Sequence, residues 1–306
     1  MNSMGVPYDR QPDGYLETGG RRVASFSQQE DSGTIDHETV RSFGEEWDRF
    51  DAFCEDEVES IAAGYFDVVQ DGMIGSGSVA LDIGCGGGRW AQYLSRRVGF
   101  VEAVDPSTAV VQAAARLDGM TNVRVTQASV AGLPFPDNSF DFVMCLGVLH
   151  HLPDTERALA MCARKLKPGG HLLVYVYYAL DQRGLLYRMV WRASDLLRKL
   201  ICKLPSAAKR LVCDVIAFSV YLPLVVFGRL LKRFGILPSL RRRLPLAYYS
   251  DKSFYVMRND ALDRFGTPLE RRFTRDEIRG MMERSGLADT TFSERAPYWH
   301  AVGRRA

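Results

Sequence analysis

The hydrophobic pattern changes period along the chain, and the change separates predicted strands from predicted helices. Short apolar runs predict buried strands, and segments with apolar residues at three- and four-residue intervals predict the helices between them. The alternation favours an α/β fold with a doubly wound, parallel sheet. The expected strands are 79–83, 100–105, 123–127, 141–146, 171–178, 287–294 and 298–302, with helices at 89–97 and 155–166 and a capped helix starting at Thr274.

The first of these strands ends in a glycine-rich turn. Gly84, Gly86 and Gly88 stand at alternate positions, and Asp82 comes two residues before them. Glycines permit positive φ angles and close approach of a ligand, and the following helix offers free N–H groups, so the turn predicts a nucleoside-type cofactor. Dehydrogenases use G-x-G-x-x-G, whereas the spacing here is G-x-G-x-G. This turn alone leaves dehydrogenase, methyltransferase and a purely structural glycine turn open.

A second acid ends the next predicted strand. Asp105 stands where a Rossmann-like fold places a carboxylate that accepts hydrogen bonds from ribose hydroxyls. The alternative is an acid that only starts the following helix.

Two sequence motifs further along the chain narrow the choice among these classes of protein. Leu133-Pro134-Phe135 precedes the fourth strand, and Val148-Leu149-His150-His151-Leu152-Pro153-Asp154 follows it. With the glycine turn, they resemble class I S-adenosylmethionine (SAM) methyltransferases of the small-molecule group, which includes ubiquinone and menaquinone methyltransferase-like proteins. The resemblance implies a Rossmann-like, mostly parallel seven-stranded sheet with an antiparallel last strand, SAM as cofactor and no metal. The cofactor-binding residues that it implies are Asp82, Gly84, Cys85, Gly86, Gly88, Asp105, Pro106, Ser129, Val130, Leu146 and Trp47.

Ser129 departs from the family pattern, and Trp47 has a second interpretation. Ser129 replaces the family's usual Asp for the adenine amino group, so the Val130 N–H is expected to carry more of the adenine recognition. Trp47, with Phe50, lies in the aromatic segment that folds over the cofactor in the resembling proteins, although aromatic residues at helical spacing also suit a plain core.

His150 and His151 are the candidate catalytic bases. Imidazole titrates near neutral pH, and the pair lies beside the predicted cofactor. The alternative is a structural role for both rings.

Composition excludes several classes of function. The 39 Lys and Arg residues nearly balance 37 Asp and Glu, and no basic stripe interleaves with aromatics, so we expect no nucleic-acid partner. The six cysteines lack metal-ligand spacing, and no signal-peptide pattern opens the chain, which favours a cytoplasmic protein.

Residues 179–268 form a long helical insertion after strand five, where substrate choice is expected. A basic amphipathic stretch at 185–203 precedes an apolar one at 211–231, and together they suit a pocket roof, a homodimer interface or peripheral membrane contact through 185–243. The predicted organisation is a mobile arm (1–35), a helical lid (36–78), the cofactor-binding core (79–178), the insertion (179–268) and closing elements (269–306).

The sequence therefore predicts methyl transfer from SAM to O or C of a hydrophobic or lipid-like small molecule. The alternative is a non-catalytic SAM-binding or membrane-associated partner subunit.

Overall fold

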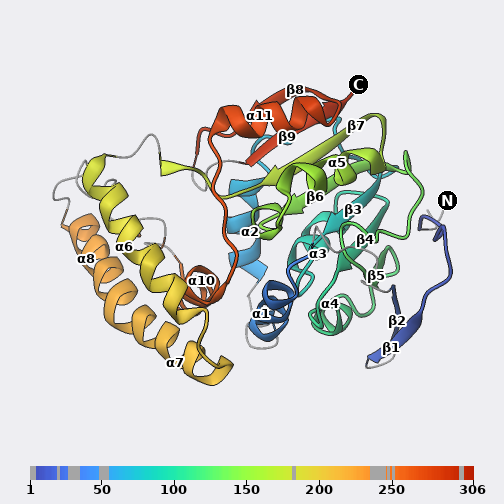
Figure 1. The fold of residues 1–306 in the computed structure, drawn as a ribbon. Helices are drawn as coiled ribbons and strands as arrows, with labels where there is room; N and C mark the ends of the chain where they lie inside the picture. The colour runs from blue at the N-terminus through green and yellow to red at the C-terminus, as the bar shows by residue number, and fades with distance from the viewer. Residues whose placement is uncertain are drawn as a thin grey trace. The chain divides into compact units, whose positions relative to one another are not determined.

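The computed structural model describes residues 5–18, 21–26, 35–47, 55–180, 184–234, 246, 249, 252–295 and 300–306. The chain divides into two compact units, Met1–Gln182 with Leu269–Ala306, and Arg183–Pro268. The second unit starts four residues later than the predicted insertion and ends at the same residue. Figure 1 shows strands only in the first unit and helices in both.

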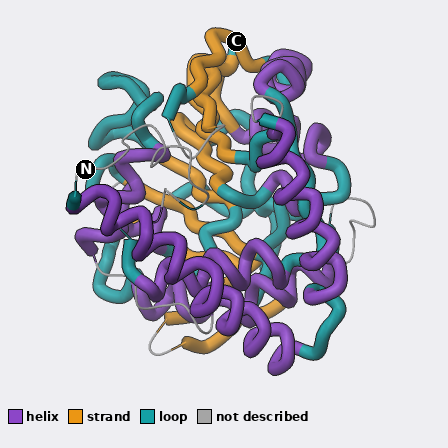
Figure 2. Tube along the Cα trace, turned by 90° about the vertical axis from the view of Figure 1, so that its left-hand side faces the viewer, coloured by secondary structure: helices purple, strands orange, loops and turns teal. Residues whose placement is uncertain are grey.

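The first unit is built on a single sheet of nine described strands in the order β1-β2-β5-β4-β3-β6-β7-β9-β8. Strands β2 through β7 pair in parallel across the middle, and β9 runs antiparallel to both β7 and β8. Figure 2 shows the strands following one another in a twisted band. The predicted seven-stranded arrangement with an antiparallel last strand is confirmed for β3 to β9, which are Val79–Ile83, Phe100–Asp105, Val123–Gln127, Phe140–Leu146, Leu166–Tyr175, Leu287–Phe292 and His300–Arg305.

The N-terminal prediction is wrong in part. Residues expected in a mobile arm instead form β1 (Gly14–Thr18) and β2 (Arg21–Ser25), which extend the sheet beyond β5. The segment before β1 is also anchored, because the Val6 N–H donates to Glu102 Oε1 at 2.9 Å and the Tyr8 hydroxyl lies 2.7 Å from that of Thr126. These long-range contacts supply the stability that the local sequence lacks.

Helices cover both faces of the sheet, because the strand order reverses between β3 and β6 and right-handed crossovers then run to opposite sides. Helix α3 packs against α4 and α2, and α11 packs against α5. The predicted capping box at Thr274 and Glu277 is present at the start of α11. The helices are α1 (His37–Trp47), α2 (Glu55–Tyr65), α3 (Arg89–Ser95), α4 (Val110–Arg116), η1 (Leu149–His151), α5 (Thr155–Lys165) and α11 (Arg275–Arg284).

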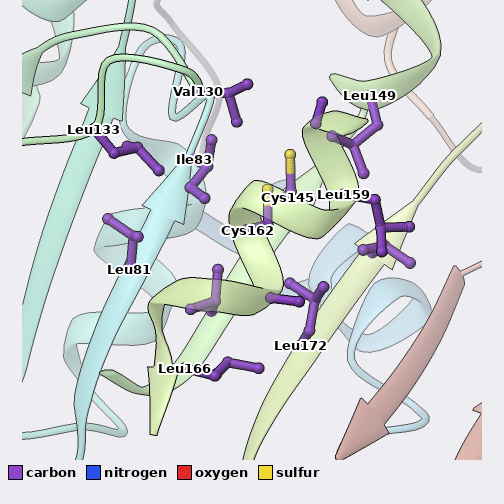
Figure 3. Close-up of a cluster of buried hydrophobic side chains, with 14 of the residues drawn as sticks. Leu81, Ile83, Val130, Leu133, Cys145, Leu149, Leu159, Cys162, Leu166 and Leu172 are labelled. Carbon is purple, nitrogen blue, oxygen red and sulfur yellow. The ribbon is translucent and has the colours of Figure 1, made fainter. Parts of the chain in front are cut away.

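The core lies between the central strands and α5. Figure 3 shows Leu81 and Ile83 of β3, Cys145 of β6, and Leu159 and Cys162 of α5 in one cluster. All five side chains are buried, with exposures of 2% or less. This packing holds the carboxyl ends of β3 and β6 side by side, where open α/β sheets bind ligands.

The second unit is helical in all its described elements. Helix α6 (Leu185–Ile201) is followed by a continuous helix made of α7 (Ser206–Ile216), the π-helical turn η3 (Ala217–Tyr221) and α8 (Leu222–Arg233). Helix α10 (Phe254–Gly266) packs against α6, α7 and η3.

Candidate functional site

The glycine turn after β3 bends toward β4. The N–H groups of Gly84 and Cys85 both donate to the Val104 carbonyl, at 2.7 and 3.0 Å. Gly84, Gly86 and Gly88 have φ angles of 76°, 51° and 80°, in the left-handed region that glycine alone adopts readily. Cys85 is buried within the turn. The predicted need for three glycines is therefore confirmed by the backbone.

Two of these glycines also stand in crowded places. A Cβ on Gly84 would lie 2.2 Å from Cγ2 of Val148, the residue just before η1. A Cβ on Gly88 would lie 3.2 Å from Ala113 of α4. The glycine turn therefore touches the loop that carries His150, so the two predicted halves of the site are neighbours.

Asp82 carries a buried carboxyl group next to this turn. Its side chain is 1% exposed, and Oδ2 has no hydrogen-bond partner among the described residues. Burial, and then the charge of Asp105, raise its pKa to about 8, while Arg89 acts in the opposite direction. An orphan buried acceptor costs free energy, so this position suits a cationic group that completes it.

Asp105 ties the turn to the end of β4. Its Oδ2 accepts the Gly86 N–H at 2.9 Å, and its Oδ1 accepts the N–H and hydroxyl of Ser107 at 2.8 and 2.6 Å. Burial raises its pKa despite these hydrogen bonds. Each carboxylate oxygen has more than one acceptor site, so the predicted ribose contact remains open to it. Pro106 follows and is half-buried.

The remaining predicted cofactor residues lie on neighbouring strand ends. The Ser129 hydroxyl accepts the Gly132 N–H at 3.0 Å, and Ser129 and Val130 are both buried after β5. Leu146 ends β6 and is also buried. Trp47 ends α1, but its side chain lies outside the described part of the chain, as does Phe50.

His150 and His151 differ sharply in their surroundings. His151 Nδ1 lies 2.7 Å from the Leu269 carbonyl oxygen. His150 is fully buried, and neither of its ring nitrogens has a hydrogen-bond partner among the described residues. Burial, and then the neighbouring His151 and Arg272, lower the pKa of His150 well below its ordinary value. The lowered pKa favours the neutral imidazole, whose ring nitrogens make no hydrogen bond to the described residues.

Aromatic rings that the sequence analysis does not single out surround His150. Tyr177 stacks on it with ring centroids 3.9 Å apart, and Tyr175 lies 6.2 Å away. Tyr65 of α2 joins Tyr175 to Trp90 of α3, at centroid distances of 5.0 and 5.4 Å. The Val-Tyr-Val-Tyr-Tyr string at 174–178 is the signal that could have found the two tyrosines, because alternate residues of a strand share a face.

Helix α1 contacts both the loop after β4 and the loop after β6. The Phe43 ring lies 4.9 Å from that of His151, and a Cβ on the adjacent Gly44 would lie 2.8 Å from the Thr108 hydroxyl, just after β4. The helix thus touches loops at the ends of β4 and β6, which flank β3 and its glycine turn.

Arg271 and Arg272 support the histidine loop. The Arg271 N–H donates to the His150 carbonyl at 2.9 Å, and Arg272 pairs with the buried Glu270 at 2.9 Å.

Comparison with known proteins shows the family of this chain. A family model described as a methyltransferase domain matches residues 81–174. An uncharacterized methyltransferase of Mycobacterium bovis is 32% identical over 134 residues, which are 43% of this chain and 68% of that protein. A ubiquinone biosynthesis O-methyltransferase of Alkalilimnicola ehrlichii is 42% identical over 96 residues, covering 30% of this chain and 39% of that protein.

The region that matches the family model lies within the first unit, and the chain spans only about two fifths of the Alkalilimnicola relative's length. The crystal structure of YcgJ from Bacillus subtilis overlaps 76% of this chain and 69% of its own, with 20% identity and a TM-score of 0.45. From the methyltransferase-domain match and the Mycobacterium relative, the chain belongs to the class I SAM-dependent methyltransferases, whose cofactor is SAM.

Proposed function

We propose that this protein transfers the methyl group of SAM to an oxygen or carbon atom of a hydrophobic small molecule, and that His150 accepts the proton which the acceptor loses. SAM supplies an activated methyl group on its sulfonium, so the protein has to bind, orient and deprotonate.

The residues at the glycine turn fit this cofactor. The orphan Oδ2 of Asp82 suits the methionine ammonium, since a cation relieves the cost of a buried carboxylate. The N–H groups and positive φ angles of the turn leave room for a ligand beside the backbone. Asp105 is proposed to accept the ribose hydroxyls, and Ser129 and Val130 to face the adenine edge.

The observation that carries the proposal is the unpartnered state of His150. A buried structural histidine normally has a hydrogen-bond partner, and His300 shows the usual case, with Nε2 2.7 Å from Asp67 Oδ1. His150 has no such partner among the described residues. Its low pKa keeps it neutral at physiological pH, so it can accept a proton without first losing one.

The proposed step balances. The acceptor O–H or C–H bond breaks, its proton passes to the free nitrogen of His150, and its electron pair forms the new bond to the methyl carbon. The new bond forms as the carbon–sulfur bond to the methyl group breaks, with that electron pair remaining on sulfur; the residues of the glycine turn would hold the demethylated cofactor until release, and His150 returns the proton to solvent.

The environment of His150 supports a hydrophobic, planar acceptor. Tyr177 and Tyr175 lie against it with a ring face and a ring edge, and Tyr65 packs on Tyr175. Such surfaces pack well on apolar or aromatic molecules. The Alkalilimnicola relative is named for O-methylation in ubiquinone biosynthesis, which agrees with this class of acceptor.

Incubation with methyl-labelled SAM and a panel of hydrophobic phenols, enols and carboxylic acids tests the proposal. We expect label in an organic-extractable product, and about 100-fold to 10,000-fold less with His150→Gln, the range for loss of a general base. His171→Gln, which changes a half-buried histidine of β7, is the matched control and should keep full activity. Equal activity of His150→Gln would assign proton removal elsewhere, and tight SAM binding without transfer to any acceptor would favour a non-catalytic SAM-binding subunit.

A further inference from the structure

The second unit exposes an unusual amount of apolar surface. Of the 18 large hydrophobic side chains that are exposed in the described part of the chain, 16 lie between Leu185 and Phe254. Single exposed apolar residues are normal on soluble proteins, but a contiguous set marks an interaction surface.

These side chains follow one side of each long helix. On α6, Leu185, Met189, Leu196 and Leu200 repeat at intervals of four and seven residues and are 57–73% exposed. The continuous helix and the turn that follows it carry a second row, in which most neighbours are three or four residues apart: Leu211, Val215, Phe218, Val226, Leu230 and Phe234. Residues at these intervals share one helix face. We call the two rows together the apolar face.

Some charged side chains of the same helices point the other way, toward the neighbouring helices and turns of the second unit. Asp214 of α7 pairs with Arg258 of α10 through two contacts of 3.0 Å. Arg198 of α6 is 4% exposed and donates to Asp195 and to the carbonyls of Thr267 and Pro268. The Arg198–Asp195 pair is thus largely buried and the Asp214–Arg258 pair is partly covered, while leucine and phenylalanine face outward. A water-facing bundle shows the opposite preference.

The unit is also strongly basic. Residues 183–268 contain 17 Lys and Arg but only five Asp and no Glu, a net charge of +12, whereas the whole chain carries +2 and the remainder therefore −10. Exposed basic residues adjoin the apolar face. On α6 the exposed basic residues repeat at intervals of four and seven residues, like the apolar residues, and form a row beside them: Arg188, Arg192 and Lys199. On α8 the exposed basic residues are Arg229 and Arg233.

We propose that the second unit docks on the surface of an anionic lipid bilayer, with the apolar face inserted among the acyl chains and the basic residues at the phosphate level. A helix with one apolar face and basic flanks lies in the membrane interface. This inference is independent of the proposed methyl transfer. Docking on the bilayer would bring the enzyme to the surface where a hydrophobic acceptor is dissolved.

The positive charge of the second unit favours an anionic lipid bilayer over a second copy of the chain as the docking partner. A homodimer through the apolar face would bring two units of +12 together, and this repulsion opposes association. An anionic bilayer has the complementary sign.

The contacts of the long helix favour lying on the bilayer over crossing it. Ser206–Leu231 is long and apolar enough to span a membrane by length and composition, with a mean hydropathy of 2.2 and 28% of its window buried. Its Asp214, however, is held in an ion pair with Arg258, and a spanning helix would take that pair into hydrocarbon at high cost.

Vesicle flotation of the full chain tests the proposal. We expect association with phosphatidylcholine vesicles that contain phosphatidylglycerol, and at least about 1,000-fold weaker association with phosphatidylcholine alone, as the five exposed basic residues near the surface predict. Salt should weaken the binding. The double variant Leu196→Glu, Leu200→Glu should weaken binding to anionic vesicles by roughly 30-fold or more, because two side chains lose their burial.

The matched control is Tyr15→Glu with Val111→Glu, which places the same charges on exposed apolar positions of the first unit and should bind vesicles like the wild type. Calorimetric SAM binding by every variant shows that the first unit is folded. Three results would overturn the proposal: no vesicle association by SAM-binding protein, a salt-insensitive dimer that the Leu196 and Leu200 changes dissociate, or resistance to carbonate extraction, which indicates a spanning helix. Vesicle binding without methyl transfer would instead refute only the proposed function.

Discussion

Binding of SAM should release a proton from Asp82. The carboxyl is 1% exposed, and its pKa is raised from 3.8 to about 8, so at pH 6 to 7 it is protonated in the free protein. A shift of about four units corresponds to about 6 kcal/mol against the charged form. The SAM ammonium, which stays protonated below pH 7, supplies the missing cation and lowers this pKa again.

The coupling between SAM binding and proton release from Asp82 sets the pH dependence of the Kd for SAM. If the bound pKa falls below 6, one proton leaves for each SAM bound, and the Kd becomes about tenfold smaller for each unit of pH from 6 to 7, because each unit of pH adds 1.36 kcal/mol to the linked binding. Calorimetry at pH 6.0, 6.5 and 7.0, in buffers that differ in ionisation enthalpy, counts the released protons.

Asp82→Asn is the matched variant, since it keeps the shape of the side chain and cannot titrate. Its SAM affinity should be weaker at pH 7 and should not vary between pH 6 and 7. A wild-type Kd that is constant over this range, with no proton released, would contradict the assignment of Asp82 as the ammonium partner.

Three further predictions concern separate parts of the first unit. Gly84→Ala should abolish SAM binding, because its Cβ would meet Val148 at 2.2 Å, whereas Gly119→Ala, at a similar φ of 78° but in open space, should keep it; calorimetry compares the two. The wild-type kcat should stay constant down to pH 6.5 and fall only below it, since burial lowers the pKa of His150; an acid limb above pH 6.5 would exclude His150 as the base. Burial raises the pKa of Glu102 from 4.5 to about 7, so the folded state binds the extra proton and wild-type stability should fall, relative to Glu102→Gln, by about 3 kcal/mol as pH rises from 4.5 to 7.5. Urea unfolding of both proteins at the two pH values measures that difference, and parallel curves would show that Glu102 keeps its ordinary pKa.

The central strands could be predicted with their bounds because they are buried on both faces. Val79–Ile83 and Phe100–Asp105 are mostly apolar runs, which is how parallel strands under two helix layers appear in a sequence. Val123–Gln127 instead places valines at alternate positions among polar residues, which also predicts a strand. Strand β7 begins at Leu166 rather than at the predicted His171, because the glycine and proline before His171 suggested a turn.

The N-terminal hairpin was missed because its stability is not local. Strand β2 joins the sheet through pairing of Ala24 with Thr126, about a hundred residues away. A usable signal was present, since Gly19-Gly20 separates two short alternating runs and such a pair often joins hairpin strands.

Spacing predicted the glycine turn and its positive φ angles but not the surroundings of His150. The pKa of His150 is lowered first by burial and then by His151 and Arg272, and its ring is stacked on Tyr177. Arg272 and Tyr177 lie far from it in the chain, so the local sequence does not predict its surroundings. The apolar stripes of α6 and α7 were likewise visible, but periodicity alone does not say which stripe packs and which faces outward.

The most direct test of the account is recovery of the methyl group. Methyl-labelled SAM is incubated with the wild-type protein and a lipid extract containing hydrophobic phenols and enols, and the organic phase is analysed by mass spectrometry. The account predicts labelled products that gain one CH₂ with the wild type, and no such products with Gly84→Ala. SAM binding by the wild type without any labelled product would contradict it.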